Sequence, residues 1–350
     1  MQNYPNRFLS KLICFYQNYK SNFNVYYVVE PYDWAIKYVG VKIKEGIRGV
    51  SLRLTTEIAF IRNSIVHFGS INTLIINDRL TIPHQSNKVI VTCFHLEDND
   101  KRNILIQRAD VFVKLWVTSC SLTKEKLKKL GIRNDKIIVI HLGIDLNLFK
   151  RYSPLIKNKI KDRYCIPKDK FIIGSFQKDG DGWSDGDIPK YVKGPDILCK
   201  VLLKISLKYD IFVLLSGPSR GYVKNFLTQN GIPFFHKYFK NQVGIAEFYN
   251  ACDLYLMTSR VEGGPMSILE SWATGTPLIA TNVGIVPDIV KNEINGLVVK
   301  VNDINSMVKQ IEWLFENKRE SIKITNQALE DAKEFSWKKI SDIYRQQLYK

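Results

Sequence analysis

The order of apolar and polar residues predicts a repeated alternation of buried strands and amphipathic helices. Short apolar runs, typical of strands covered on both faces, recur from residue 24 to about residue 320. In the first half of the chain these runs are Val25–Val29, Ser64–Phe68, Val89–Phe94, Val111–Thr118 and Lys136–His141. In the second half they are Phe171–Phe176, Ile211–Ser216, Pro233–His236, Leu254–Thr258, Leu278–Thr281 and Leu297–Val299.

Helical patterns occupy the intervals between these runs. One helix is expected from Ser121 to Leu130, with Ser121 at its N-cap and Gly131 just past its end. Another, Pro195–Leu207, carries a single apolar stripe formed by Ile197, Leu198, Val201, Leu202 and Ile205. Further helices are expected at Val243–Asn250, Pro265–Thr274 and Ile304–Phe315. The alternation predicts an α/β fold in which helices cover parallel sheets.

Chain length and one charged interval predict two domains. A chain of 350 residues is long enough for two hydrophobic cores. The interval that begins at Lys150 is charged and contains Pro154, so we expect residues 1–155 to form one domain and residues 156–335 the other. Residues 1–22 precede the first strand as an extension. Two doubly wound domains would bind ligands at the carboxyl ends of their strands.

The formal charge of +17 favours an anionic partner. Residues 1–150 hold 22 basic and 12 acidic residues, a net of +10. Phe8–Tyr19 mixes apolar, aromatic and basic residues and could form an amphipathic helix at an anionic membrane surface, although packing on its own domain is the simpler interpretation. No zinc finger or RNA-recognition signature is present, so we expect no nucleic acid partner. A lysine-rich solvated surface explains the charge about as well.

The cysteines and the N-terminus indicate a reduced, cytoplasmic protein. The six cysteines lie far apart and form no Cys-x-x-Cys pair, so a zinc site is not expected. The first residues lack the regions of a signal peptide, and no apolar run is long enough to span a membrane. The aspartate-rich residues 179–187 lack the spacing of a calcium loop.

The most informative stretch follows a strand that ends near Thr258. Gly263 and Gly264 allow a ligand to approach the backbone closely, and Pro265 suits the first helical position. The free N–H groups of that helix start, together with the helix dipole, suit a pyrophosphate. Glu270 lies further along the helix and can accept two hydrogen bonds, as a ribose diol requires. From these residues alone, an ordinary strand–loop–helix with solvated glutamates is an equal alternative.

Glu262 and Glu270 are separated by seven residues, within Glu-Gly-Gly-Pro and Leu-Glu-Ser-Trp-Ala-Thr-Gly-Thr-Pro. This pattern, with residues 282–290 and 295–299 after it and residues 140–145 before it, resembles the group 1 (family 4) retaining glycosyltransferases. The resemblance is dense from about residue 170 to 300 and thin before residue 88. It implies the GT-B fold, an α/β fold of two Rossmann-like doubly wound domains facing a cleft, with residues 336–350 forming a helix that crosses back to the first domain.

The resemblance also implies roles for individual residues. Glu262 would lie against the donor sugar, and Glu270 would bind the nucleotide ribose. Lys193, in Lys-Gly-Pro-Asp, would stabilise the departing diphosphate. Backbone groups would meet the pyrophosphate and sugar at Gly263, Gly264, Pro265, Met266 and Ser267.

Two further catalytic candidates match the family less closely. Ser175 stands where the family usually has arginine, so we expect Lys178 to supply that charge, with a surface lysine as the alternative. His95 follows a strand where the family often places a histidine facing the transferred sugar; a structural histidine is the alternative.

The expected activity is therefore retaining transfer of a sugar from a nucleotide-diphosphate sugar to an acceptor. By analogy with the family, the acceptor is expected to be a glycan or a lipid-linked molecule in surface polysaccharide assembly, at the inner face of the membrane. No metal or cofactor is expected, because lysines and a helix start would replace the ion. The alternatives are a catalytically silent partner subunit and a nucleotide-sugar epimerase. A nicotinamide dehydrogenase is disfavoured, because no Gly-x-Gly-x-x-Gly follows a strand.

Overall fold

The computed structural model describes residues 7–20, 23–32, 35–182 and 185–350. Backbone contacts divide the chain into unit 1, residues 1–142 with 337–350, and unit 2, residues 143–336. The sequence pattern placed the boundary at 155/156, whereas these contacts place it at 142/143. The intervening segment bonds to unit 2, since the Ile144 N–H donates to Phe335 O (2.7 Å) and the Tyr152 N–H to Asn250 Oδ1 (2.8 Å).

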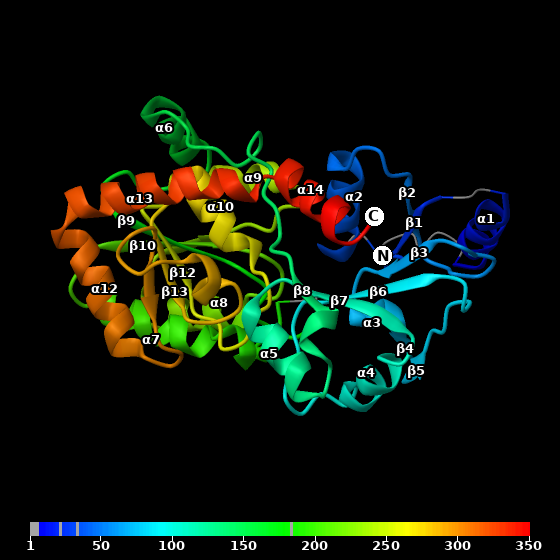
Figure 1. The fold of residues 1–350 in the computed structure, drawn as a ribbon. Helices are drawn as coiled ribbons and strands as arrows, with labels where there is room; N and C mark the ends of the chain where they lie inside the picture. The colour runs from blue at the N-terminus through cyan, green and yellow to red at the C-terminus, as the bar shows by residue number, and fades with distance from the viewer. Residues whose placement is uncertain (1–6, 21–22, 33–34, 183–184) are drawn as a thin grey trace. The chain divides into compact units, whose positions relative to one another are not determined.

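Unit 1 is built on a parallel sheet of six strands in the order β2-β1-β3-β6-β7-β8 (Figure 1). Its strands are β1 (Val25–Val28), β2 (Leu52–Thr55), β3 (Ile65–Phe68), β6 (Lys88–Cys93), β7 (Val113–Thr118) and β8 (Ile137–Val139). A small antiparallel pair is formed by β4 (Ile75–Ile76) and β5 (Arg79–Leu80). The helices are α1 (Arg7–Lys20), α2 (Ala35–Gly46), α3 (Ile71–Leu74), α4 (Asn103–Ala109), α5 (Ser121–Lys129), η1 (Asn134–Lys136) and α14 (Trp337–Gln347).

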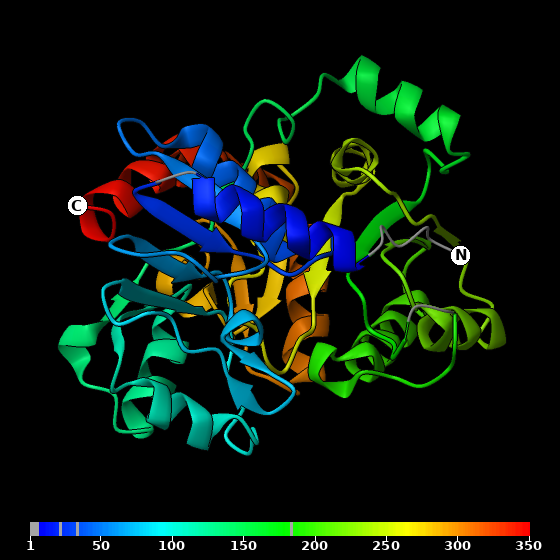
Figure 2. The ribbon, with the colours of Figure 1, turned by 90° about the vertical axis from the view of Figure 1, so that its right-hand side faces the viewer.

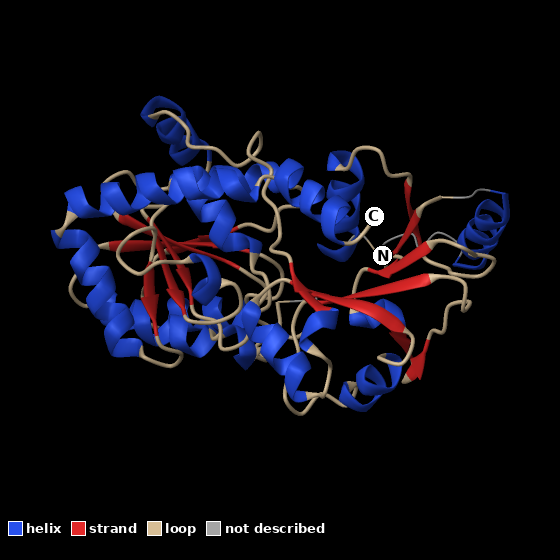
Figure 3. Ribbon diagram, viewed as in Figure 1, coloured by secondary structure: helices blue, strands red, loops and turns tan. Residues whose placement is uncertain are grey.

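Unit 2 is a second parallel six-stranded sheet, in the order β11-β10-β9-β12-β13-β14. Its strands are β9 (Phe171–Phe176), β10 (Ile211–Ser216), β11 (Phe234–His236), β12 (Leu254–Met257), β13 (Leu278–Thr281) and β14 (Leu297–Val299). The helices are α6 (Pro154–Arg163), η2 (Tyr191–Lys193), α7 (Pro195–Ser206), α8 (Gly221–Gln229), α9 (Gln242–Ala251), α10 (Met266–Thr274), α11 (Val286–Ile289), α12 (Ile304–Glu316), α13 (Lys318–Ala332) and η3 (Lys333–Phe335). Figure 3 shows these helices on both faces of the sheet.

The predicted alternation of strands and helices is confirmed, with small shifts at the ends of elements. The apolar stripe of α7 is buried in the core of unit 2, as its spacing predicts. Two caps differ by one residue: Cys120 rather than Ser121 is the N-cap of α5, and Pro265 is the N-cap of α10 rather than its first helical residue. Gly131 lies just past α5 with φ of 88°, as expected for a helix end. The edge strand β2 is not predicted by the apolar pattern.

The C-terminal helix α14 packs in unit 1, against α2. Gly46 allows this contact, because a Cβ there would overlap the Ser341 hydroxyl. Beyond the helix, the Tyr349 hydroxyl lies 2.6 Å from His67 Nδ1, and the other ring nitrogen of His67 lies 2.8 Å from Thr92 Oγ1. All three side chains are buried, so this polar network ties the end of the chain to strands β3 and β6.

Helix α1, the dark blue helix in Figure 2, packs on unit 1 through one face and exposes another. On the packed side, the buried Asn18 amide donates to Glu57 O at 2.9 Å. The opposite side presents apolar and aromatic side chains that are 46% to 75% exposed, namely Leu12, Ile13, Tyr16 and Tyr19. Side chains before Leu12 lie outside the described part of the chain. None of the helices in the described ranges is long and apolar enough to cross a membrane.

Candidate functional site

The predicted donor segment follows β12 in unit 2 and touches the loop that follows the neighbouring strand β9. The Thr258 hydroxyl donates to Gly194 O at 2.9 Å, and the Arg260 N–H donates to Val192 O at 2.8 Å. Gly194 has φ of 65°, and a Cβ there would overlap the Thr258 carbonyl oxygen. Because β9 and β12 pair in parallel, their carboxyl ends bring these two loops together.

This contact places Lys193 against Glu262. Lys193 Nζ lies 2.6 Å from Glu262 Oε1, and the buried Ser259 hydroxyl donates to the same oxygen at 2.8 Å. The side chains of Lys193 and Glu262 are 26% and 12% exposed, so the ion pair is partly desolvated but open to solvent on one side. The cation expected near the diphosphate and the carboxylate expected near the sugar therefore form an ion pair.

Helix α10 supplies the backbone groups expected to bind the pyrophosphate. The N–H groups of Met266 and Ser267 precede the first turn's bonds, whereas the Ile268 N–H lies 3.4 Å from Pro265 O, and Pro265 makes no side-chain cap. Met266 and Ser267 begin the helix, and both are partly exposed. Gly263 is buried, and its carbonyl oxygen lies so close to Gly284 that a Cβ on Gly284 would overlap it. The next residue, Gly264, is partly exposed, so the turn leaves the helix start accessible to an anion.

Glu270 lies one turn further along α10 and is held by a tyrosine. The buried Tyr249 hydroxyl donates to Glu270 Oε2 at 3.0 Å and lies 3.3 Å from Ser267 O. Glu270 keeps part of its surface in solvent, yet burial of its carboxylate raises the pKa to about 7, opposed by the hydrogen bond from Tyr249. The second oxygen can accept hydrogen bonds from a ligand diol.

Gln177 and Arg220 enter the site although sequence reasoning did not select them. Gln177 Nε2 donates to Lys193 O at 2.9 Å, and Gln177 Oε1 lies 3.4 Å from the Ser259 hydroxyl. Arg220 is completely buried and donates to Ser175 O at 2.7 Å and Ser175 Oγ at 3.3 Å. A guanidinium therefore does lie at Ser175, where the family arginine is absent, but it comes from the residue before α8. The sequence signal for this contact is an arginine shortly after β10, the strand that pairs with β9. It is hard to recognise because Arg220 and Ser175 are far apart in the sequence.

Lys178 and His95 are the two other residues predicted to be catalytic. Lys178 is half-buried just after β9, next to Gln177. His95 is exposed after β6 and belongs to unit 1. Both roles remain predictions.

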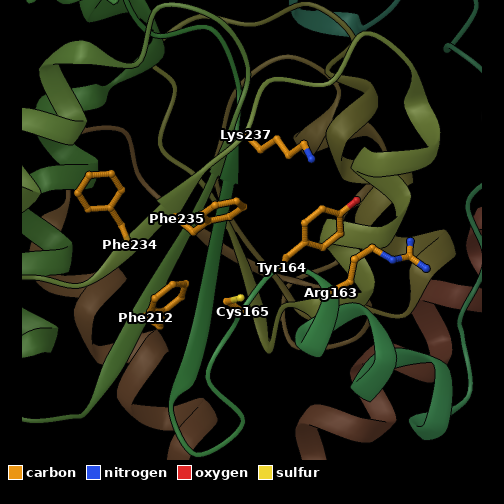
Figure 4. Close-up of a pocket in the computed structure, with 7 residues that line it drawn as sticks. All are labelled: Arg163, Tyr164, Cys165, Phe212, Phe234, Phe235 and Lys237. Carbon is orange, nitrogen blue, oxygen red and sulfur yellow. The ribbon is translucent and has the colours of Figure 1, made fainter.

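A separate hollow of about 570 Å³ lies elsewhere in unit 2, at the edge of its sheet (Figure 4). It is lined by Arg163, Tyr164, Cys165, Phe212, Phe234, Phe235 and Lys237. None of these residues belongs to the predicted donor set, and Arg163 is already paired with Glu247 at 2.6 Å. Across the described ranges, no group of three or more His, Cys, Asp or Glu side chains could hold a metal ion.

The chain is similar to known glycosyltransferases. Residues 186–331 match the family model of glycosyl transferases group 1. An uncharacterized glycosyltransferase of Methanocaldococcus jannaschii is 29% identical over 307 residues, which cover 71% of this chain and 86% of that protein. The Escherichia coli UDP-Gal:alpha-D-GlcNAc-diphosphoundecaprenol alpha-1,3-galactosyltransferase is 27% identical over 190 residues, 53% of this chain and 46% of the enzyme. Other curated relatives are matched over about half of their length.

The fold has a close counterpart among solved structures. The Anabaena protein HepE, in complex with UDP, matches with a TM-score of 0.75 and 16% identity over 93% of this chain and 98% of HepE. HepE has also been solved with UDP-glucose. This likeness shows the GT-B fold, with two Rossmann-like units each built on a parallel sheet.

Proposed function

We propose that this chain, whose residues 186–331 match the family model of glycosyl transferases group 1, transfers a sugar from a UDP-sugar to a glycan or lipid-linked acceptor with retention of configuration. The observation that carries the proposal is the Lys193–Glu262 pair beside the open start of α10, with Glu270 on the same helix. Uridine is chosen because HepE binds UDP and UDP-glucose in the same fold.

In this proposal, different residues of unit 2 bind different parts of the donor. Glu270 would accept hydrogen bonds from the ribose diol, and the first N–H groups of α10 would bind the diphosphate. Lys193 would leave Glu262 and stabilise the negative charge that grows on the departing diphosphate. Glu262 would then be released to orient the sugar. Because these cationic and dipolar groups neutralise the diphosphate, we propose that transfer needs no metal ion.

In the proposed transfer, the acceptor hydroxyl attacks C1 from the face that the diphosphate leaves. The bond between C1 and the phosphate oxygen breaks, the new bond from C1 to the acceptor oxygen forms, and the departing phosphate takes the acceptor proton. This sequence needs no protein nucleophile, and it retains the configuration at C1. From the sequence resemblance alone, we propose that His95 faces the transferred sugar.

For the setting, we propose surface polysaccharide or glycolipid assembly at the cytoplasmic face of a membrane. The E. coli relative is named for a lipid diphosphate acceptor, which supports a lipid-linked substrate here. The exposed Leu12, Ile13, Tyr16 and Tyr19 of α1, with Phe60 beside them at 56% exposure, form an apolar surface suited to the membrane interface. The net charge of +10 in residues 1–150 would strengthen contact with anionic lipids.

The test is transfer by the purified protein in EDTA. A panel of UDP-, GDP- and ADP-sugars is screened by thermal shift, and donors that stabilise the protein are incubated with lipid-linked glycans. We expect a UDP-sugar to stabilise the protein and to yield a product whose anomeric configuration, read by NMR, matches the donor. Donor binding without product would indicate a silent subunit, and donor conversion without acceptor would indicate an epimerase. Turnover restored only by manganese would overturn the metal-independent site.

A further inference from the structure

Lys193 lies at the end of a long loop that follows β9. Its position depends on the bonds that join the end of this loop to its start. The loop leaves β9 after Phe176 and returns at the short turn η2, which ends at Lys193. Within η2 the Lys193 N–H donates to Lys190 O at 2.8 Å, a bond that shapes the turn but does not anchor it to the sheet. On the β9 side, the Lys190 N–H donates to Asp179 O at 2.8 Å. Lys193 itself is held from that side by Gln177, whose Nε2 donates to Lys193 O at 2.9 Å; the Thr258 hydroxyl, just after β12, lies 3.5 Å from the same oxygen. One side chain thus joins the first part of the loop to its last residue.

Gln177 is itself held by Arg220. Arg220 Nη1 donates to three carbonyl oxygens, those of Ser175 (2.7 Å), Gln177 (3.0 Å) and Ser216 (2.9 Å). These oxygens belong to the carboxyl ends of β9 and β10 and to the residue that follows β9. A single guanidinium therefore fixes the two strand ends and the backbone of Gln177 together, with the geometry that a planar fork of donors allows.

The charge of Arg220 is balanced within the protein. Arg220 Nε lies 3.0 Å from Asp179 Oδ1, and both side chains are completely buried. Burial raises the pKa of Asp179, and Arg220 opposes that rise. Arg220 has no exposed surface, so the groups that its side chain contacts belong to the protein.

We propose that Gln177 and Arg220 are positioning residues for Lys193. Arg220 holds the Gln177 backbone, and the Gln177 side-chain amide holds the Lys193 backbone; we call these two bonds the positioning chain. This inference rests on the proposed function, since it assigns the two residues to the use of Lys193 on the departing diphosphate. The lysine matters most where charge develops, so a small displacement lowers the turnover number more than it changes the Michaelis constant for the donor.

The experiment is a double-mutant cycle between Gln177 and Lys193. Gln177→Met keeps the length of the side chain and removes the amide. We expect it to lower kcat by roughly 10- to 100-fold, since a displacement of about 1 Å can cost about 100-fold, with the donor KM nearly unchanged. In a Lys193→Met background the same change should have almost no further effect, because the residue it positions is gone. Equal losses in both backgrounds would show that Gln177 acts independently of Lys193 and would overturn the proposal.

Arg220 is tested by Arg220→Lys, which keeps a charge for Asp179 but loses the planar fork, and by the Asp179→Asn, Arg220→Met double variant, which removes the buried charges together. Each should lower kcat in the wild-type background and much less in the Lys193→Met background. Full kcat in Arg220→Lys would remove Arg220 from the positioning chain.

Two controls separate this inference from the proposed function and from folding. Gln107 donates a side-chain bond to Leu130 O at 2.9 Å in unit 1, so Gln107→Met removes a matched bond elsewhere and should leave kcat unchanged. The same cycle is measured without turnover through the affinity for UDP, by calorimetry. UDP carries the charge that the intact donor develops only as the diphosphate departs, so Gln177→Met should weaken UDP binding, though not the donor KM, when Lys193 is present and not when it is absent. A wild-type protein that binds UDP and shows this coupling, yet transfers no sugar, would contradict the proposed function and keep the positioning chain.

Discussion

Lys193 Nζ and Glu262 Oε1 lie 2.6 Å apart, so the cation proposed to meet the departing diphosphate forms an ion pair with a carboxylate. In the proposed transfer this pair would couple two steps, because the lysine would leave the carboxylate to reach the phosphate. Binding of the donor would therefore also free Glu262 for the sugar.

The first prediction follows from this pair. Glu262→Gln removes the carboxylate charge and releases Lys193, so UDP should bind more tightly, by about fivefold if the partly exposed pair is worth ~1 kcal/mol. Sugar transfer should fall, because the carboxylate that orients the sugar is lost. Calorimetry with UDP and a transfer assay measure the two effects, and Lys193→Met should weaken UDP binding. Weaker UDP binding by Glu262→Gln would show that Lys193 is not restrained by the pair.

The second prediction concerns the pH dependence of Glu270. Its pKa of about 7 means that the carboxylate is protonated progressively as pH falls below 7, and it then accepts hydrogen bonds from a ribose diol less strongly. The affinity for UDP should fall from pH 8 to pH 6 more steeply in the wild type than in Glu270→Gln. The titration of the nucleotide itself affects both proteins equally, so the difference between them reports Glu270. At pH 8 the variant should bind more weakly by about 1–3 kcal/mol. Parallel pH profiles would remove Glu270 from the ribose site.

The same shift has a consequence for stability. Because the pKa of Glu270 is raised above its ordinary value of 4.5, the folded protein binds the proton more strongly than the unfolded chain. Glu270 therefore makes a favourable contribution below pH 4.5 that is lost as pH rises towards 7. Glu270→Gln should flatten this part of the stability profile.

The third prediction concerns the contact between the two donor loops. Gly194→Ala should disable the site, because the new Cβ would overlap Thr258 O and force apart the loops that carry Lys193 and Glu262. Gly131→Ala is the matched control, since Gly131 also has positive φ (88°) and no atom lies within 4 Å of a Cβ there. The control should lose only about 1 kcal/mol of stability and keep UDP binding. Similar UDP affinities of the two variants, measured by calorimetry, would contradict the loop contact.

The fourth prediction concerns the buried His67. Burial lowers its pKa from 6.5 to about 3, so the unfolded chain takes up a proton between these values while the folded protein does not. The stability of unit 1 should therefore fall as pH is lowered from 6.5 towards 3. His67→Phe should remove this pH dependence and leave the Tyr349 and Thr92 hydroxyls unsatisfied, at a cost of about 1–3 kcal/mol at pH 7.

Urea unfolding at several pH values measures both effects of the His67 substitution. His84→Phe changes an exposed histidine of the same unit and should leave the profile nearly as it was. A His67→Phe protein that is as stable as the wild type at pH 7 would show that the network contributes no net stability.

The fifth prediction concerns α1. Vesicles with anionic lipids should sediment the protein at low salt and release most of it at 1 M salt, where the screening length is about 3 Å. A Leu12→Ser, Tyr16→Ser double variant should sediment less at any salt concentration, because it removes exposed apolar side chains without changing charge. Ile76→Ser, on an exposed residue of the same unit, is the control. Equal sedimentation of the double variant and the wild type would show that α1 does not contact lipid.

The sequence by itself determined the alternation of strands and helices, including the strand–loop–helix from β12 to α10. Runs such as Phe171–Phe176 and Ile211–Ser216 agree with β9 and β10 at both ends, because continuous apolar residues suit strands buried on both faces. The glycine and proline positions marked the loop before α10, since few other residues suit those turns. The short edge strand β2 was not evident, because a strand of four residues with two partly buried positions has little apolar signal.

Only the tertiary structure decided which residues stand beside Lys193. The sequence pattern favoured Lys178 as the substitute at Ser175, because it lies three positions away in the chain. In the folded unit the guanidinium beside Ser175 belongs to Arg220, which is 45 positions away and follows a neighbouring strand. Parallel pairing of β9 with β10 and with β12 gathers the ends of strands that are far apart in sequence. Periodicity reports how each strand is buried, but the order of strands in the sheet decides which side chains meet.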